Sequence, residues 1–185
     1  MLKTRLERDI AATAVIVHGK PASDFVKKLL EIGFGEIIVA HDGGAMLTIG
    51  DQRVHQLSFG EGFRDRAAGL NVALEFIEDD FRAKDIRFIL MLSSKVVLDE
   101  IRWATVFSWN HLPGVMAIGA TLQASEGEIY EFSNDFALYR REAFNRHSLS
   151  RFPSEEKEAI AWKAQFESLQ YGKVYEHYFQ VRIAQ

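Results

Sequence analysis

The sequence contains no cysteine among its 185 residues. A disulfide bond, a thiolate nucleophile and a cysteine-ligated zinc ion are therefore excluded. The absence of cysteine also fits a reducing compartment, so we expect a cytoplasmic protein. A basic excess is missing as well, because the net charge is -4 at pH 7. Tight nucleic-acid binding usually shows as such an excess, so the composition does not indicate a nucleic-acid partner.

Long apolar runs and linkers are missing too. The apolar run at residues 10–17 is too short to span a bilayer, and the charged residues before it do not suit a signal peptide. No internal repeat, low-complexity segment or Pro/Ser-rich linker divides the chain. A hydrophobic fraction of 48% with 26% charged residues is ordinary for a soluble globular domain. We therefore expect a single domain over residues 1–185, without a transmembrane segment.

The most informative stretch that is present reads RFILMLSSKVVL, residues 87–98. Its apolar residues 88–92 break abruptly into the polar triplet Ser93, Ser94 and Lys95. An uninterrupted apolar run of this length is typical of a strand buried on both faces in the middle of a parallel sheet. Ligands of open α/β sheets bind beyond the carboxyl ends of the strands. The polar triplet is therefore the first place to look for function.

The first half of the chain predicts alternating strands and helices. Strands are predicted at 11–17, 36–40, 54–57 and 88–92, and helices at 23–32 and 63–81. Ser23 is the expected N-cap of the first helix, and Gly33 is its expected stop. The second helix carries apolar residues at alternating steps of four and three, which is the pattern of an amphipathic helix. Strand, helix and strand at the beginning form a βαβ unit.

The second half predicts shorter elements. Helical segments are expected around 99–108, 140–146 and 153–172, and strands at 115–122, 128–132, 136–139 and 173–181. The strands at 115–122 and 128–132 are either a hairpin or two successive strands of a mixed sheet. Pro153 and Ser154 are expected to start the late helix. Its expected core face consists of Ala159, Trp162, Phe166 and Leu169.

Four pieces occur in the order GEIIVAHDGG, RAAGLNVALE, RFILMLSSKVVL and FALYRREAF, followed by a predicted helix ending in YGKVYEH. In this order and at about this spacing, between Ala12 and His177, they resemble the family 2 glycosyltransferases, nucleotide-sugar-dependent enzymes of the GT-A fold. The resemblance implies an α/β, Rossmann-like fold with a mostly parallel central sheet flanked by helices and a small mixed-sheet acceptor side. Residues 1–98 would be the nucleotide-binding half and residues 99–185 the acceptor-side half.

The resemblance also implies roles for single residues. Asp42 matches the acidic residue after the second strand that contacts the base or ribose, and a turn aspartate before Gly-Gly is the structural alternative. Arg66 and Asn71 match residues that hold the nucleotide or its loop, and a solvated arginine and a helix-edge asparagine are the alternative. Arg140 and Arg141 match an Arg-Arg pair, whose guanidinium groups suit a diphosphate but are commonly just solvated.

The sequence departs from the family pattern at two places. The family's central strand ends in an Asp-x-Asp motif that holds Mg²⁺ or Mn²⁺, whereas Ser93, Ser94 and Lys95 supply no carboxylate. We expect these three residues to contact the nucleotide, with Lys95 stabilising the diphosphate without a divalent metal; a solvated loop lysine is the alternative. The family's catalytic base lies at the start of the late helix, where Glu156 or Glu158 would substitute. The histidines show no two-ligand spacing, so no metal ligand is predicted.

Two functions fit these residues. The first is a glycosyltransferase that moves a sugar from a nucleotide-sugar donor to an acceptor that the sequence does not identify. The second is a degenerate GT-A module that binds or assembles without turnover, which the missing carboxylates favour. A third reading is an unrelated nucleotide-binding α/β protein, which would have a strand order different from the GT-A sheet. The sequence indicates neither the sugar nor the oligomeric state.

Overall fold

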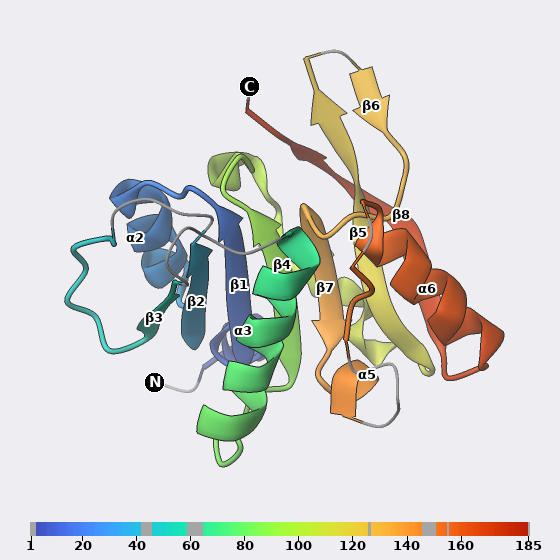
Figure 1. The fold of residues 1–185 in the computed structure, drawn as a ribbon, viewed down its shortest axis with the longest axis horizontal. Coiled ribbons are helices and arrows are strands. Elements are labelled where there is room, and N and C mark those ends of the chain that lie inside the picture. Colours follow the sequence, from blue (N-terminus) through green and yellow to red (C-terminus); the bar gives the residue numbers. More distant parts are fainter. Residues whose placement is uncertain are drawn as a thin grey trace.

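The computed structural model describes residues 3–41, 46–58, 65–125, 127–145, 151–154 and 156–184. They form one 8-stranded mixed sheet with helices on both faces (Figure 1). The strand order is β3-β2-β1-β4-β7-β5-β6, and β8 pairs with β5. The strands are β1 (Thr13–Gly19), β2 (Glu36–His41), β3 (Val54–Leu57), β4 (Phe88–Ser93), β5 (Val115–Ala124), β6 (Gly127–Ile129), β7 (Phe136–Arg140) and β8 (Lys173–Arg182). The helical elements are α1 (Arg5–Ala11), α2 (Ser23–Ile32), α3 (Arg66–Asp80), η1 (Leu98–Glu100), α4 (Trp103–Val106), η2 (Ser108–His111), α5 (Glu142–Asn145) and α6 (Glu158–Ser168).

The parallel part of the sheet consists of β3, β2, β1 and β4. Val15 of β1 faces Ile37 of β2 on one side and Leu90 of β4 on the other. The predicted βαβ unit is therefore confirmed, and β3 has the predicted bounds. Parallel strands start at one edge of a sheet and end at the other, so the carboxyl ends of β1, β2 and β4 lie at a common edge.

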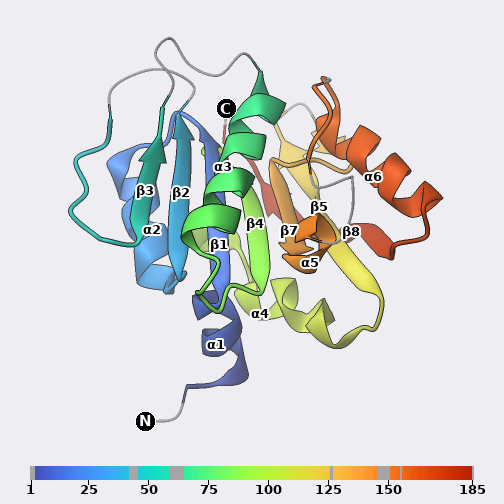
Figure 2. The same ribbon diagram turned by 60° about the horizontal axis from the view of Figure 1, so that its bottom comes forward.

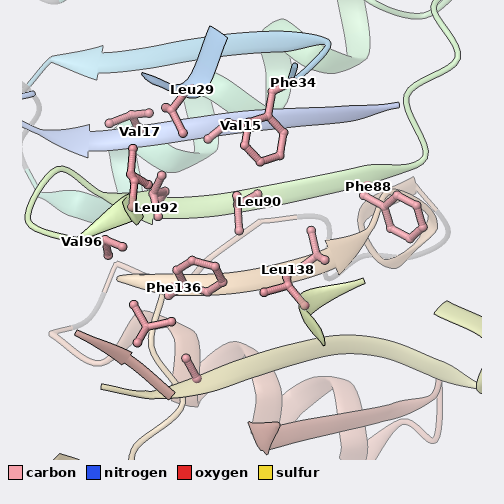
Figure 3. Close-up of a cluster of buried hydrophobic side chains, with 14 of the residues drawn as sticks. Val15, Val17, Leu29, Phe34, Phe88, Leu90, Leu92, Val96, Phe136 and Leu138 are labelled. Atoms are coloured by element: carbon pink, nitrogen blue, oxygen red, sulfur yellow. The ribbon is translucent and has the colours of Figure 1, made fainter. Parts of the chain in front are cut away.

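β4 is buried on both faces, as its uninterrupted apolar run predicts. Phe88, Leu90 and Leu92 pack into the core that α2 and α4 cover (Figure 3). Ile89 and Met91 point to the opposite face and pack with residues of α3 and α6. Successive side chains of a strand point to opposite faces, so one apolar run supplies both cores. This arrangement explains why β4 lies in the middle of the sheet, between β1 and β7.

The second half of the sheet corrects the expectation of a mostly parallel sheet. β7 runs antiparallel to both β4 and β5, and β6 forms a hairpin with β5. β8 is parallel to β5. A short connection such as the one between β5 and β6 can join antiparallel strands, whereas parallel neighbours need a long crossover. The sheet is therefore mixed, with four parallel strands in residues 13–93 and a further parallel pair formed by β5 and β8.

α2 and α3 agree with the sequence patterns, with small differences at their ends. Ala22 is the N-cap of α2 in place of Ser23, and Gly33 ends the helix with a φ of 99°. A positive φ costs glycine little, which explains why the helix stops there. α3 begins after its N-cap Asp65, and its apolar residues, including Leu74, are buried. The predicted start of this helix at 63 lies outside the described residues. Figure 1 shows α3 lying across one face of the sheet.

Other helices depart further from the predictions. α6 begins at Glu158, later than Pro153, and Leu169 is 47% exposed and lies outside its core face. The helix expected at 99–108 is divided into the short elements η1, α4 and η2, in a region without an apolar period. α1 was not predicted; Thr4 and Glu7 begin it with a capping box. No described helix combines the length and the apolar character that a membrane crossing needs.

Candidate functional site

Polar side chains from distant parts of the chain meet at the edge of the sheet where β1 and β4 end. We call them the strand-end cluster, which consists of His18, Arg66, Ser93, Asn134, Asp135 and Glu158. His18 and Ser93 are register partners at the ends of β1 and β4. Because β7 is antiparallel to β4, its first residues lie at the same edge, and the Ser93 amide donates to the Asp135 carbonyl at 2.9 Å. The starts of α3 and α6 add the two longest charged side chains.

Arg66 pairs with both carboxylates of this cluster. Its Nε lies 2.7 Å from Glu158 Oε1, and its Nη2 donates to Glu158 Oε2 at 2.9 Å. Its Nη1 donates to Asp135 Oδ1 at 3.2 Å. The pKa of Arg66 is raised: burial acts to lower it, but the hydrogen bonds to Glu158 and the charges of Glu158 and Asp135 outweigh burial. Arg66 therefore stays charged and pairs with both carboxylates, Asp135 and Glu158.

Glu158 is held from a second side by the buried residue Asn134. Asn134 Nδ2 donates to Glu158 Oε1 at 3.3 Å, and Asn134 Oδ1 accepts from the Tyr139 hydroxyl at 2.5 Å. Tyr139 is fully buried, and burial raises its pKa well above the ordinary value, with the charge of Glu158 acting in the same direction. The Tyr139 hydroxyl thus remains a donor. Glu158 is only 1% exposed, and both of its oxygens are already bonded.

His18 belongs to the cluster although its sequence spacing did not single it out. Its Nε2 lies 3.0 Å from the Asn134 carbonyl oxygen, which can only accept, so Nε2 carries the proton. Burial lowers the pKa of His18 and outweighs Asp135, whose carboxylate lies 3.7 Å away and acts to raise it. His18 is therefore neutral near pH 7, and its Nδ1 is an acceptor with no partner among the described residues. Its place at the end of a buried strand beside Gly19 was the signal that could have found it.

The polar triplet follows β4 into the same edge, as predicted. Ser93 is buried and its hydroxyl accepts from the Lys95 amide at 3.3 Å. The Ser94 amide donates to the His18 carbonyl at 3.0 Å. Lys95 is exposed, and its carbonyl accepts from the Ala184 amide at 2.7 Å, so the carboxyl-terminal segment fixes its backbone. The structure thus brings Arg66 and the triplet together, with Asp135 bonded to both.

The described side chains of this edge do not form a site suited to a divalent cation. Such a cation needs several carboxylate or carbonyl oxygens that are not already neutralised. Asp135 and Glu158 both pair with Arg66, and Lys95 brings a further positive charge. Within the described ranges, no group of three or more histidine, aspartate or glutamate side chains could hold a metal ion. Asp42, predicted to contact the base or ribose, lies outside the described residues.

Asn71 has a structural contact that the sequence did not reveal. Its Nδ2 donates to the Phe152 carbonyl at 2.9 Å, and its Oδ1 accepts from the Phe152 amide at 2.7 Å. Both ends of the amide are thus occupied by one backbone residue. Asn71 therefore clamps the segment before α6 onto α3. Glu156 lies in the turn just before α6 and is exposed.

Arg140 and Arg141 lie at the opposite edge of the sheet from Lys95. Arg140 is the register partner of Phe88, the first residue of β4, whereas Lys95 follows the last. Arg140 Nε donates to the Val115 carbonyl at 2.7 Å, and its guanidinium lies over Trp109 at 4.9 Å. Arg141 donates to two carbonyls at the end of α3. The structure therefore does not bring either arginine to a diphosphate held by Lys95, and that expectation is corrected.

Comparisons with known proteins show what the fold resembles. No family model matches the chain, and no curated protein matches it at a significant level of sequence similarity. Among solved structures, A197 from STIV is similar with a TM-score of 0.58 and 12% identity, over 93% of this chain and 81% of that chain. TarS 1-349 from S. aureus is similar with a TM-score of 0.59 and 14% identity, over 93% of this chain. This chain spans only 60% of the TarS fragment.

A third similar structure comes from Desulfovibrio desulfuricans G20 and is described as a nucleotide-diphospho-sugar transferase. Its TM-score is 0.50 at 12% identity, over 92% of this chain and 80% of that chain. At such low identities the likeness concerns the fold alone. The chain therefore has a mixed α/β fold similar to the GT-A-like fold of glycosyltransferases.

Proposed function

We propose that this protein is a glycosyltransferase that binds a nucleotide-sugar donor beyond the carboxyl ends of β1, β2 and β4. The observation that carries the proposal is the strand-end cluster, which lies at the edge where open α/β sheets bind ligands. The likeness to glycosyltransferase-like folds agrees with it, although one fold can serve many activities. Asp42, which follows β2, would contact the base or ribose at this edge.

The chemistry of transfer gives Lys95 a role. A nucleoside diphosphate leaving group gains negative charge as the glycosidic bond breaks, and a positive group must stabilise it. Lys95 is exposed at the end of β4, and no described carboxylate pairs with its side chain. We therefore assign Lys95 to the diphosphate, and donor binding does not depend on a divalent metal. Ser93 and Ser94 position Lys95 through the turn that they form.

The base that accepts the acceptor's proton is assigned to Glu156. A general base needs a lone pair that points at its substrate. Both oxygens of Glu158 are engaged by Arg66, whereas Glu156 is exposed and bonds to no described residue. Glu158 is then a positioning residue that holds Arg66 and the start of α6.

A degenerate binding module is the second candidate, and one observation favours it. Arg66 pairs with both carboxylates of the strand-end cluster, Asp135 and Glu158, so neither is left unpaired for catalysis or metal binding. Such a protein would bind the nucleotide sugar without turnover. Binding and hydrolysis measured on the same samples separate the two candidates.

Calorimetry with uridine and guanosine diphosphates, in EDTA and in Mn²⁺, tests the proposal. We expect binding in EDTA that is lost in Lys95→Ala and kept in Lys173→Ala, an exposed lysine at the opposite edge of the sheet. Binding that requires Mn²⁺ would contradict the role of Lys95, and no binding in either condition would contradict a nucleotide site. Release of sugar from nucleotide-sugar donors then decides between transferase and module.

A further inference from the structure

A cavity lies at the edge of the sheet where β4 begins, away from the strand-end cluster. Its volume is about 840 Å³, a size that suits a small-molecule ligand. α1 lies at this edge (Figure 2). The described residues that line the cavity are Arg5, Arg8, Asp9, Asp85, Ile86, Arg87, Phe88, Arg140, Arg141 and Glu142. Arginine is thus its most frequent lining residue, in a protein whose net charge is -4.

Hydrogen bonds bring these arginines together from three distant segments. The amide of Arg87, just before β4, donates to the Ala12 carbonyl at 2.8 Å, and its Nη2 donates to the Arg8 carbonyl at 3.2 Å. These bonds tie α1 to the start of β4. The Arg141 amide donates to the Arg87 carbonyl at 2.9 Å, which adds the end of β7. The fold itself therefore gathers the positive charges.

The carboxylates of the cavity do not balance these charges. Arg87 and Arg5 share Asp9, at 3.2 Å and 3.8 Å, and Asp9 is only 4% exposed. Asp85 is 3.9 Å from Arg87 and its side chain is 86% exposed, so this pair is weak. The Arg8 guanidinium is exposed and has no partner among the described residues. Five arginines against three carboxylates leave an excess of two positive charges in the cavity.

Arg140 and Arg141 are held in place by contacts that include backbone carbonyls and an aromatic ring. Arg141 donates to the carbonyls of Ile77 and Phe81, and Arg140 stacks on Trp109. A guanidinium held in this way loses little conformational entropy when it binds an anion. The Arg-Arg pair is thus preorganised at this cavity, although it lies far from Lys95.

We propose that this cavity binds a small phosphate-bearing ligand, at a site distinct from the nucleotide-sugar site. Arginine forks match the geometry of phosphate oxygens, and several can share one phosphate group. β4 separates this cavity from the strand-end cluster, and its six residues extend over about 17 Å. A phosphate in the cavity is therefore bound independently of the diphosphate at Lys95.

Calorimetry with inorganic pyrophosphate, at constant ionic strength, tests the proposal on the full chain. Arg8→Glu is the informative variant, because the Arg8 side chain forms no hydrogen bond or ion pair with a described residue and its replacement should change the unfolding midpoint little. Arg102→Glu is the matched control, since Arg102 is also exposed and lines no part of this cavity. Lys95→Ala reports on the strand-end site.

We expect Arg8→Glu to weaken pyrophosphate binding by about tenfold or more, the usual worth of a charge-assisted bond. Arg102→Glu should bind like the wild type. The Lys95→Ala protein should still bind pyrophosphate, and adding Arg8→Glu to it should weaken that binding. The proposal is overturned if no saturable binding occurs, or if Arg8→Glu binds as tightly as the wild type. Complete loss of binding in Lys95→Ala would place the pyrophosphate at the strand-end site and also overturn it. Nucleoside diphosphate binding is scored separately, so failure of one site does not decide the other.

Discussion

Arg66 at the start of α3 holds Glu158 at the start of α6 in a two-point ion pair, with contacts of 2.7 Å and 2.9 Å. The two residues lie 92 positions apart in the sequence. Their contact links two halves of the sheet. One half consists of the parallel strands β3, β2, β1 and β4, and the other contains β7, β5 and β8. The candidate site lies where these two halves of the sheet meet. Its charged residues are therefore also part of the packing of the fold.

Glu158→Gln should destabilise the protein because it leaves Arg66 charged beside a neutral amide. Breaking a buried pair usually costs about 3–5 kcal/mol, and we expect about 2–3 kcal/mol because Arg66 remains 33% exposed. Urea unfolding measures the change. Glu156→Gln is the control and should stay within about 0.5 kcal/mol of the wild type. A stable Glu158→Gln protein that has lost sugar transfer would instead identify Glu158 as the base.

Asn71→Ala should destabilise the protein without a specific effect on nucleotide binding. The substitution leaves the amide and the carbonyl of Phe152 without their partner, and each unsatisfied buried group costs about 1–3 kcal/mol. Thermal unfolding measures the loss, and calorimetry on the folded protein measures nucleotide affinity. Asn71→Asp keeps an acceptor for the Phe152 amide, so its stability should lie between the stabilities of the wild type and Asn71→Ala. If Asn71→Ala had normal stability but had lost affinity for the nucleotide, Asn71 would instead belong to the nucleotide site.

Gly19→Ala should disturb the turn that holds the polar triplet. Gly19 has a φ of 91°, and a Cβ there would lie 2.7 Å from Ser94 Oγ. The unfavourable φ costs about 1–2 kcal/mol, and the clash adds to it. Adding Ser94→Ala to Gly19→Ala should restore the share of the lost stability that is due to the clash. Unfolding midpoints measure this recovery. Gly50→Ala is the control, because a Cβ there meets nothing within 4 Å. Equal stability of Gly19→Ala and the wild type would refute this packing.

His18 should make stability depend on pH. Its folded-state pKa is lowered from 6.5 by burial, so the unfolded chain takes up a proton first as the pH falls. Its stabilising contribution is complete above about pH 6.5 and is lost as the pH falls from there through the folded-state pKa, by up to about 1.4 kcal/mol per pH unit. Asp135, Glu158 and Arg66 are the charged groups around it.

Urea unfolding of the wild type and His18→Gln, above and below that pH, measures this effect. Glutamine can still donate to the Asn134 carbonyl, so it is a close replacement. We expect the wild type to lose more stability on acidification than His18→Gln. Identical losses in the two proteins would show that His18 does not titrate in this way.

Local sequence patterns predicted the elements near the parallel core. The apolar run of β4 requires burial on both faces, and this alone placed the strand in the middle of the sheet. The spacing of apolar residues in α3 and the glycine after α2 likewise act within a few turns of chain. The polar triplet at the end of β4 was found for the same reason: its position depends only on where that strand ends.

Only the tertiary structure decided which side chains meet at the site. The direction of β7 relative to β4 placed Asp135 beside Ser93 and sent Arg140 to the opposite edge. The start of α6 brought Glu158 to Arg66, and the fold buried His18 against Asn134. No periodicity records such pairings, because they join residues far apart in the chain and follow from strand order and helix packing. The sequence by itself therefore determined the layers of the fold, and tertiary packing determined which charges are neutralised and which remain for a ligand.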